Sequence, residues 1–203
     1  MSQDLHTSQL AAIADEIDQA IDEKVYRVDA AMDIDDDFVN PQARALLVRD
    51  VVVAAAATAA SRIGSIEYQT VNGLGRELRA TVGNADRRYR IKRAVRVGDL
   101  LEIRANSDSA LVRTEEPEDA LLFGVIEQWV FGWHLNSEDA VDEVFIAKVL
   151  PTTPGSTYLN LSNRRTLLSV SAGPEEAGRF ERGPDEGLPG FEDGEVGLGV
   201  GWH

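Results

Sequence analysis

The side chains that could carry covalent or metal chemistry are few and scattered. The chain has 203 residues and no cysteine, which excludes disulfide bonds and zinc sites built from cysteine. The histidines, His6, His134 and His203, do not have the spacing of a metal site. No GxSxG motif places a serine nucleophile for a base to activate. These observations favour a protein that is not an enzyme and that uses no cofactor or metal.

Two sets of carboxylates keep an enzymatic alternative open. Asp99, Glu102 and Arg104 resemble the acid-x-acid-x-base spacing of a nuclease strand, but arginine cannot release a proton near neutral pH as lysine can. Glu127 would lie among apolar residues if its segment is a strand, and desolvation there would raise its pKa. The alternative function is therefore a small metal-dependent hydrolase or nuclease, with Glu127 or the Asp99/Glu102 pair in its site.

His134 is the one histidine that falls inside the expected fold, next to Trp133. A histidine in such an apolar stretch is more often a core or pocket-rim residue than a catalytic base. We expect that position for it, and we retain it beside Glu127 as a catalytic candidate. A cleft that holds both side chains would favour the enzyme.

The clearest functional signal is a local excess of positive charge. Residues 76–104 contain nine basic and four acidic side chains, whereas the whole chain carries a net charge of −15. Read as a strand, the segment 87–97 places four basic side chains on one face: Arg88, Arg90, Lys92 and Arg96. This face is either solvated and paired with acidic helices of the same chain, or a platform for phosphates or an acidic protein.

A non-enzymatic binding or regulatory protein is therefore the favoured function, with the basic face of 76–104 against an acidic or phosphate-bearing partner. The net charge disfavours nonspecific attraction to nucleic acid or anionic membranes. We expect a protein partner, nucleic acid contact only through the basic strand, and no membrane contact. A homo-oligomer, or a structural subunit of a larger assembly, is also compatible with the sequence. No secretory signal is visible, so we expect a cytoplasmic protein.

The stretch Asn40–Gly64 predicts the helix on which the fold is built. Asn40 is a good N-cap, Pro41 suits the first helical position, and Gly64 suits the position just past the C-terminus. No broad polar face remains in its middle, so most sides should be buried. The unbroken apolar run is only about half of the ~20 residues that a membrane span needs, so we predict a core helix.

A second helix is predicted over residues 8–32. Its apolar residues recur at helical spacing on one stripe: Leu10, Ile13, Ala14, Ile17, Ile21, Val25, Val28 and Met32. We expect this stripe to pack on the central helix; a partner-binding or dimerisation helix is the alternative. The acidic segment 33–37 matches the first ligand positions of a calcium loop, but Phe38 stands where that motif needs glycine. We interpret the segment as a solvated connector.

After Gly64 the pattern changes to short runs of β-forming residues separated by glycine turns, which predicts a meander of hairpins. The first four expected strands are 65–71, 76–82, 87–97 and 100–105. The apolar stretch 120–135 is compatible with a helix or a strand, and its aromatic residues and valines favour a strand. Later strands are expected at 143–150, 157–161 and 166–170.

The predicted fold class is α+β. Two N-terminal helices, one of them largely buried, pack on an antiparallel β-sheet or a small, partly open barrel. Residues 1–172 form one domain, with a helical part at 1–64 and a β-rich part at 65–172. Glycine, proline and glutamate dominate 173–203, where too few apolar residues occur to offset the entropy of ordering, so we predict a disordered acidic tail.

Overall fold

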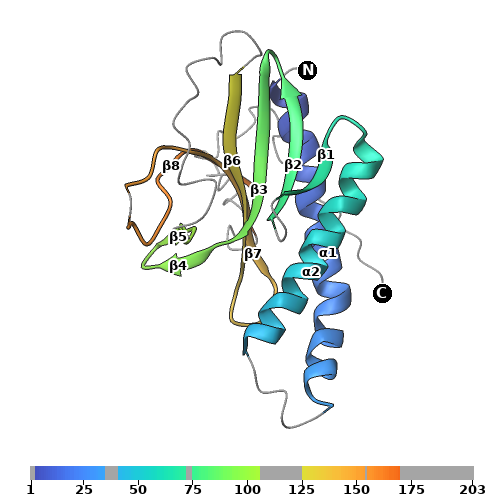
Figure 1. The fold of residues 1–203 in the computed structure, drawn as a ribbon. Helices are drawn as coiled ribbons and strands as arrows, with labels where there is room; N and C mark the ends of the chain where they lie inside the picture. The colour runs from blue at the N-terminus through green and yellow to red at the C-terminus, as the bar shows by residue number, and fades with distance from the viewer. Residues whose placement is uncertain (1–2, 35–40, 72–74, 106–124, 154, 170–203) are drawn as a thin grey trace, which may run out of the picture. The chain divides into compact units, whose positions relative to one another are not determined.

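Both predicted helices are present. The computed structural model describes residues 3–34, 41–71, 75–105, 125–153 and 155–169. Helix α1 runs over Gln3–Met32, five residues longer at its start than predicted, and α2 runs over Pro41–Ile63 alongside it (Figure 1). Gly64 follows α2 with a φ of 72°, and its N–H donates to the carbonyl of Ala60 at 3.1 Å. This is the C-terminal glycine that the sequence predicts.

Six strands form one open sheet against the helices, in the order β1-β2-β3-β6-β7-β8 (Figure 1). Their bounds are Glu67–Val71, Gly75–Val82, Ala85–Arg93, Val125–Leu135, Val141–Val149 and Leu161–Ser169. A separate two-stranded sheet consists of β4, Val95–Val97, and β5, Leu100–Glu102. The α+β class is confirmed, and the described part of the ambiguous apolar stretch is a strand.

One strand pair departs from the antiparallel arrangement. β3 and β6 are parallel, with Tyr89 opposite Trp129, whereas the other pairs of the six-stranded sheet are antiparallel. Parallel neighbours need a long connection, and residues 94–124, which include β4 and β5, separate these two strands. Local turn signals specify hairpins but carry no information about this long-range pairing.

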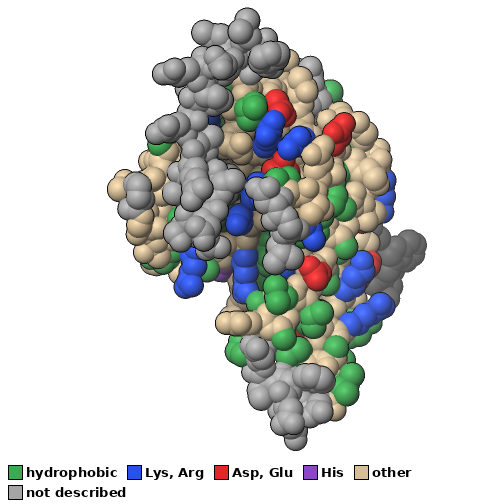
Figure 2. Space-filling view, in the orientation of Figure 1, with side chains coloured by type: hydrophobic (Ala, Val, Ile, Leu, Met, Phe, Trp, Pro, Cys, Tyr) green, Lys and Arg blue, Asp and Glu red, His purple; other side chains and the backbone are tan. Residues whose placement is uncertain are grey.

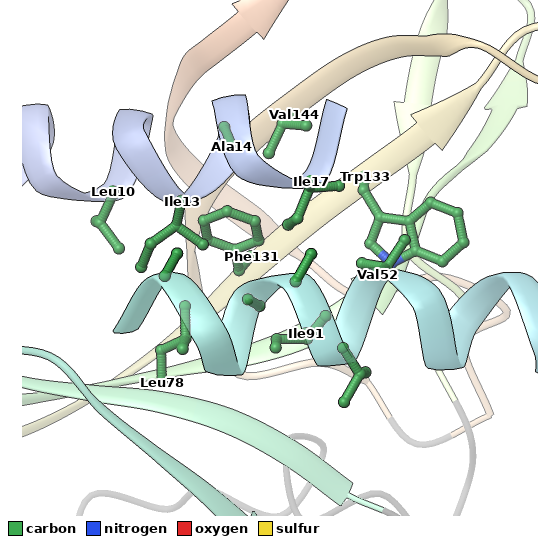
Figure 3. Close-up of a cluster of buried hydrophobic side chains, with 14 of the residues drawn as sticks. Leu10, Ile13, Ala14, Ile17, Val52, Leu78, Ile91, Phe131, Trp133 and Val144 are labelled. Carbon is green, nitrogen blue, oxygen red and sulfur yellow. The ribbon is translucent and has the colours of Figure 1, made fainter. Parts of the chain in front are cut away.

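The main core lies between the helices and one face of the sheet (Figure 3). The predicted stripe of α1 is confirmed, since most of its members are buried: Leu10, Ile13, Ala14, Ile17, Ile21 and Val28. Alternate residues of the strands supply the opposite side: Leu78, Tyr89, Ile91, Trp129, Phe131 and Trp133. A smaller core on the other face of the sheet includes Leu101, Val130 and Phe145, so β5 helps to cover that face.

The middle of α2 gives a direct test of this packing. Ala56 is fully buried, whereas Ala54 on the same helix is exposed. We predict that Ala56→Leu lowers the free energy of unfolding by about 1–3 kcal/mol, because the added carbons overpack the core. The control Ala54→Leu adds the same atoms at a solvated position, and it should change the free energy of unfolding by about 0.5 kcal/mol at most. Urea unfolding compares the two, and equal effects would contradict the placement of α2.

Some predictions fall outside the described residues. These are the N-cap Asn40, most of the acidic connector 33–37, and the tail 173–203. The described residues all belong to one compact unit, Met1–Ser171. Neither of the two described helices is long and apolar enough to cross a membrane.

Candidate anion-binding site

Three of the four predicted binding residues lie on one face of β3. Arg88, Arg90 and Lys92 alternate with Tyr89 and Ile91, which point into the main core. The three basic side chains therefore lie on the sheet face that is turned away from the helices. Figure 2 shows Lys and Arg side chains gathered over the region of β3 and β4.

The two arginines of this face are already paired within the sheet. A terminal nitrogen of Arg88 lies 2.9 Å from the carboxylate of Asp86, and one of Arg90 lies 3.3 Å from Glu77. The Glu77 side chain is only 3% exposed and also binds Arg79 at 2.6 Å. These carboxylates come from β2 and β3, not from the acidic helices that the sequence suggested as partners. Removing Arg79 or Arg90 would leave the buried charge of Glu77 with fewer partners, which costs stability.

Lys92 completes the face in a different environment. Burial lowers the pKa of its amine, and the positive charges of Arg90 and Arg49 lower it further. A cation that is crowded by other cations favours a nearby anion. The binding role of Arg88, Arg90 and Lys92 stays a prediction.

Arg96 lies apart from those three residues. β3 ends at Arg93, and the N–H of Ala94 donates to the carbonyl of Trp133 at 2.7 Å. The single strand that the sequence predicts over 87–97 is therefore divided, and Arg96 belongs to β4. This break brings its guanidinium to Asp142 of β7, where a terminal nitrogen donates to the carboxylate.

His134 binds the same carboxylate. Its Nδ1 lies 3.0 Å from Oδ2 of Asp142, and the Asp142 side chain is only 9% exposed. A carboxylate accepts hydrogen bonds, so Nδ1 is the donor here. Nε2 is the ring atom left for a ligand, and in the neutral ring it accepts a hydrogen bond, for example from a protonated phosphate oxygen. His134 is therefore a pocket-rim histidine, as expected, and Asp142 fixes the orientation of both His134 and Arg96.

These side chains line two adjoining hollows near the end of β6. The first has a volume of about 550 Å³ and is lined by Arg93, Ala94, Val95, Arg96, Arg104 and His134. The second, of about 540 Å³, shares Arg96 and His134 and reaches Asp142 and Ser137. We name Arg93, Arg96, Arg104, His134 and Asp142 the arginine–histidine pocket. Its three guanidinium groups exceed its one carboxylate, and guanidinium groups bind phosphate and carboxylate oxygens through planar pairs of donors.

Glu127 lies in a different hollow from His134, so the structure does not bring the two catalytic candidates together. Its carboxylate accepts from Arg87 Nε at 2.7 Å, Lys148 Nζ at 3.0 Å and Trp129 Nε1 at 3.2 Å. Burial raises the pKa of Glu127, but these hydrogen bonds and the charge of Arg87 outweigh burial, so the pKa is lowered. The expectation of a raised pKa is wrong, because the strand register supplies cations from β3 and β7.

The carboxylates of the metal-dependent alternative lie in an open hairpin. Asp99 is exposed in the turn between β4 and β5, and Glu102 ends β5. Among the residues that the structure describes, no group of three or more His, Asp or Glu side chains is arranged to hold a metal ion. Arg104 lines the arginine–histidine pocket instead of assisting these carboxylates.

Sequence reasoning missed Asp142, Arg93 and Arg104 as parts of a site. Arg93 and Arg104 belong to the basic segment, so its charge count contains a signal for them. No pattern in the sequence marks Asp142 as part of a site. Its position beside His134 depends on the pairing of β6 with β7 and on a register shift between His134 and Leu135.

Comparisons with protein-family models, with curated proteins and with solved structures found no match to this chain.

Proposed function

We propose that this chain is a non-enzymatic binding protein, whose basic segment 76–104 takes a phosphate or carboxylate group of an acidic partner protein. The arginine–histidine pocket is the contact. The observation that supports the proposal is the position of Asp142, a nearly buried carboxylate that orients both Arg96 and His134 at a hollow. Side chains that are held in place before binding lose little entropy when the ligand arrives.

The charge of the pocket suits this ligand class. Arg93, Arg96 and Arg104 line the first hollow, and Asp142 lines the adjoining one, so three guanidinium groups and one carboxylate lie around the pocket in a chain whose net charge is −15. Acidic surroundings would repel an anionic partner elsewhere, and the local excess of cations would direct it to this place. Regulation follows naturally if the partner gains its anionic group by phosphorylation, because phosphorylation adds up to about two negative charges.

Substitution of Arg96 tests the proposal. We predict that Arg96→Gln weakens the binding of inorganic phosphate and of a phosphorylated peptide by about tenfold to a hundredfold. A hydrogen bond to a charged group contributes about 1.5–3 kcal/mol, and each 1.4 kcal/mol is a factor of ten in Kd. Isothermal titration calorimetry measures both ligands at low and high salt. Binding should weaken as salt rises, because these side chains are partly exposed.

Arg62→Gln is the matched control. Arg62 lies on α2, is 64% exposed and pairs with Glu16, so the change removes the same charge away from the pocket. Equal losses in the two variants, or no loss in either, would overturn the proposed contact.

A further inference from the structure

The hollow around Glu127 is lined by more basic side chains than acidic ones. Seven side chains line a cavity of about 420 Å³: Arg87, Glu127, Trp129, Lys148, Asn163, Arg164 and Arg165. We name this set the Glu127 pocket. Three of its cations, Arg87, Lys148 and Arg165, stand against the carboxylate of Glu127. The guanidinium of Arg164 is directed elsewhere, because it pairs with Glu143 at 2.8 Å and packs over the Phe145 ring. The pocket therefore has an excess of two positive charges in a chain of net charge −15.

We propose that the Glu127 pocket is a second binding site, separate from the arginine–histidine pocket, that takes a phosphate group as a dianion. Glu127 acts in this site as an internal counter-ion. It holds Arg87 and Lys148 in position but neutralises only one of the three positive charges that Arg87, Lys148 and Arg165 supply. A monoanion would leave one positive charge uncompensated, so a dianion is the better match.

The donors of the pocket are held before any ligand binds. The guanidinium of Arg87 packs over the ring of Trp129 at 5.1 Å, and its side chain is 16% exposed. Glu127 accepts a hydrogen bond from Nε of Arg87 and one from the amine of Lys148, which has three N–H donors. Both side chains therefore have donors that Glu127 does not engage.

Arg165 supplies the accessible side of the pocket. It is exposed on β8 opposite Ile146, which lies in the main core, so it belongs to the helix-facing side of the sheet. Asn163 precedes it with a φ of 50°, a left-handed conformation that asparagine tolerates better than most residues. A register shift in the β7–β8 pairing accompanies this residue, and Arg164 and Arg165 line the same hollow.

The two pockets are too far apart to share one phosphate. Glu127 and His134 are seven positions apart on β6, which corresponds to about 23 Å along a strand at about 3.3 Å per residue. The side chains also alternate between the faces, so Glu127 lies on the helix side and His134 on the other. Binding at one pocket can therefore be measured without the other.

The indole N–H of Trp129 is a reporter inside this pocket, because it donates to Glu127. We expect its NMR resonance, assigned with Trp129→Phe, to shift during titration of the full chain with inorganic phosphate. Arg165→Gln should weaken this response about tenfold or more, since one charge-assisted hydrogen bond is lost. Glu127→Gln should strengthen it about tenfold, because the competing carboxylate is removed and the shape is kept.

Arg96→Gln separates this site from the proposed function, because it should leave the Trp129 response unchanged. Arg165 is exposed, so its variant should fold, and a thermal melt checks whether Glu127→Gln does. A Trp129 resonance that does not move with phosphate would overturn the second site. So would a response that Arg165→Gln leaves intact.

Discussion

Gly132→Ala is expected to be among the most destabilising single substitutions in the chain. A Cβ at this position would meet three ring atoms of Phe145 on β7, two of them at 2.7 and 2.9 Å. Phe145 is fully buried, and the Arg164 guanidinium packs against its ring at 4.1 Å, so the ring has little room to move. We expect a loss of about 3 kcal/mol, the upper part of the range for overpacking, measured by urea unfolding.

A double-mutant cycle assigns this loss to the ring contact. Phe145→Leu removes the ring atoms that the new methyl group would meet. Its effect combined with Gly132→Ala should be smaller than the sum of the two separate effects by about 1–2 kcal/mol. Strict additivity would show that the cost of Gly132→Ala has another source, such as a change in the backbone of β6.

The second large effect concerns pH and His6. This side chain is 1% exposed, and its Nε2 lies 2.8 Å from the hydroxyl of Tyr89, whereas its Nδ1 has no hydrogen-bond partner among the described residues. Burial, and then the charge of Arg87, lower the pKa of His6 to about 4. In the unfolded chain His6 keeps the ordinary pKa of about 6.5. Between about pH 4 and 6.5, therefore, the His6 ring is protonated in the unfolded chain but neutral in the folded one.

The contribution of His6 to stability is therefore complete above about pH 6.5 and falls as the pH decreases towards 4. We expect a loss of about 2–3 kcal/mol between pH 7.5 and 4.5, at about 1.4 kcal/mol for each unit of the window. The amide of His6→Gln can still reach the Tyr89 hydroxyl but does not titrate. The free energy of unfolding of this variant should therefore fall by about 2–3 kcal/mol less than that of the unchanged protein over the same pH range. Unfolding free energies at the two pH values give the difference. The same pH dependence in both proteins would mean that His6 is not buried in its neutral form.

The helices were predictable because their signals are local. The stripe on α1 and the pair of Pro41 and Gly64 around α2 are properties of short segments, and the structure confirms both. His6 precedes Leu10 by four residues, so the same stripe could have been extended to it. The predicted stripe contained only apolar residues and so left out His6. A buried histidine with a hydrogen-bond partner is nevertheless common in a protein core.

The sites were harder to predict because they depend on contacts between distant strands. Arg87 meets Glu127 only through the parallel β3–β6 pair, and Lys148 meets it only through β7. The sequence therefore identifies Glu127 as unusual but gives the wrong direction for its pKa. In the same way, the alternation of 87–97 placed Arg96 on one face with Arg90, whereas the break at Ala94 brings Arg96 to the arginine–histidine pocket.

Titration of the isotope-labelled protein with inorganic phosphate, followed residue by residue by NMR, tests the central claim most directly. We predict shifts of the His134 ring resonances and of the backbone amides of Val95, Arg96 and Arg104. These shifts should weaken at high salt and should be lost in Arg96→Gln but kept in Arg62→Gln. Resonances of the arginine–histidine pocket that stay unmoved at every phosphate concentration, or that move equally in Arg96→Gln, would contradict the account.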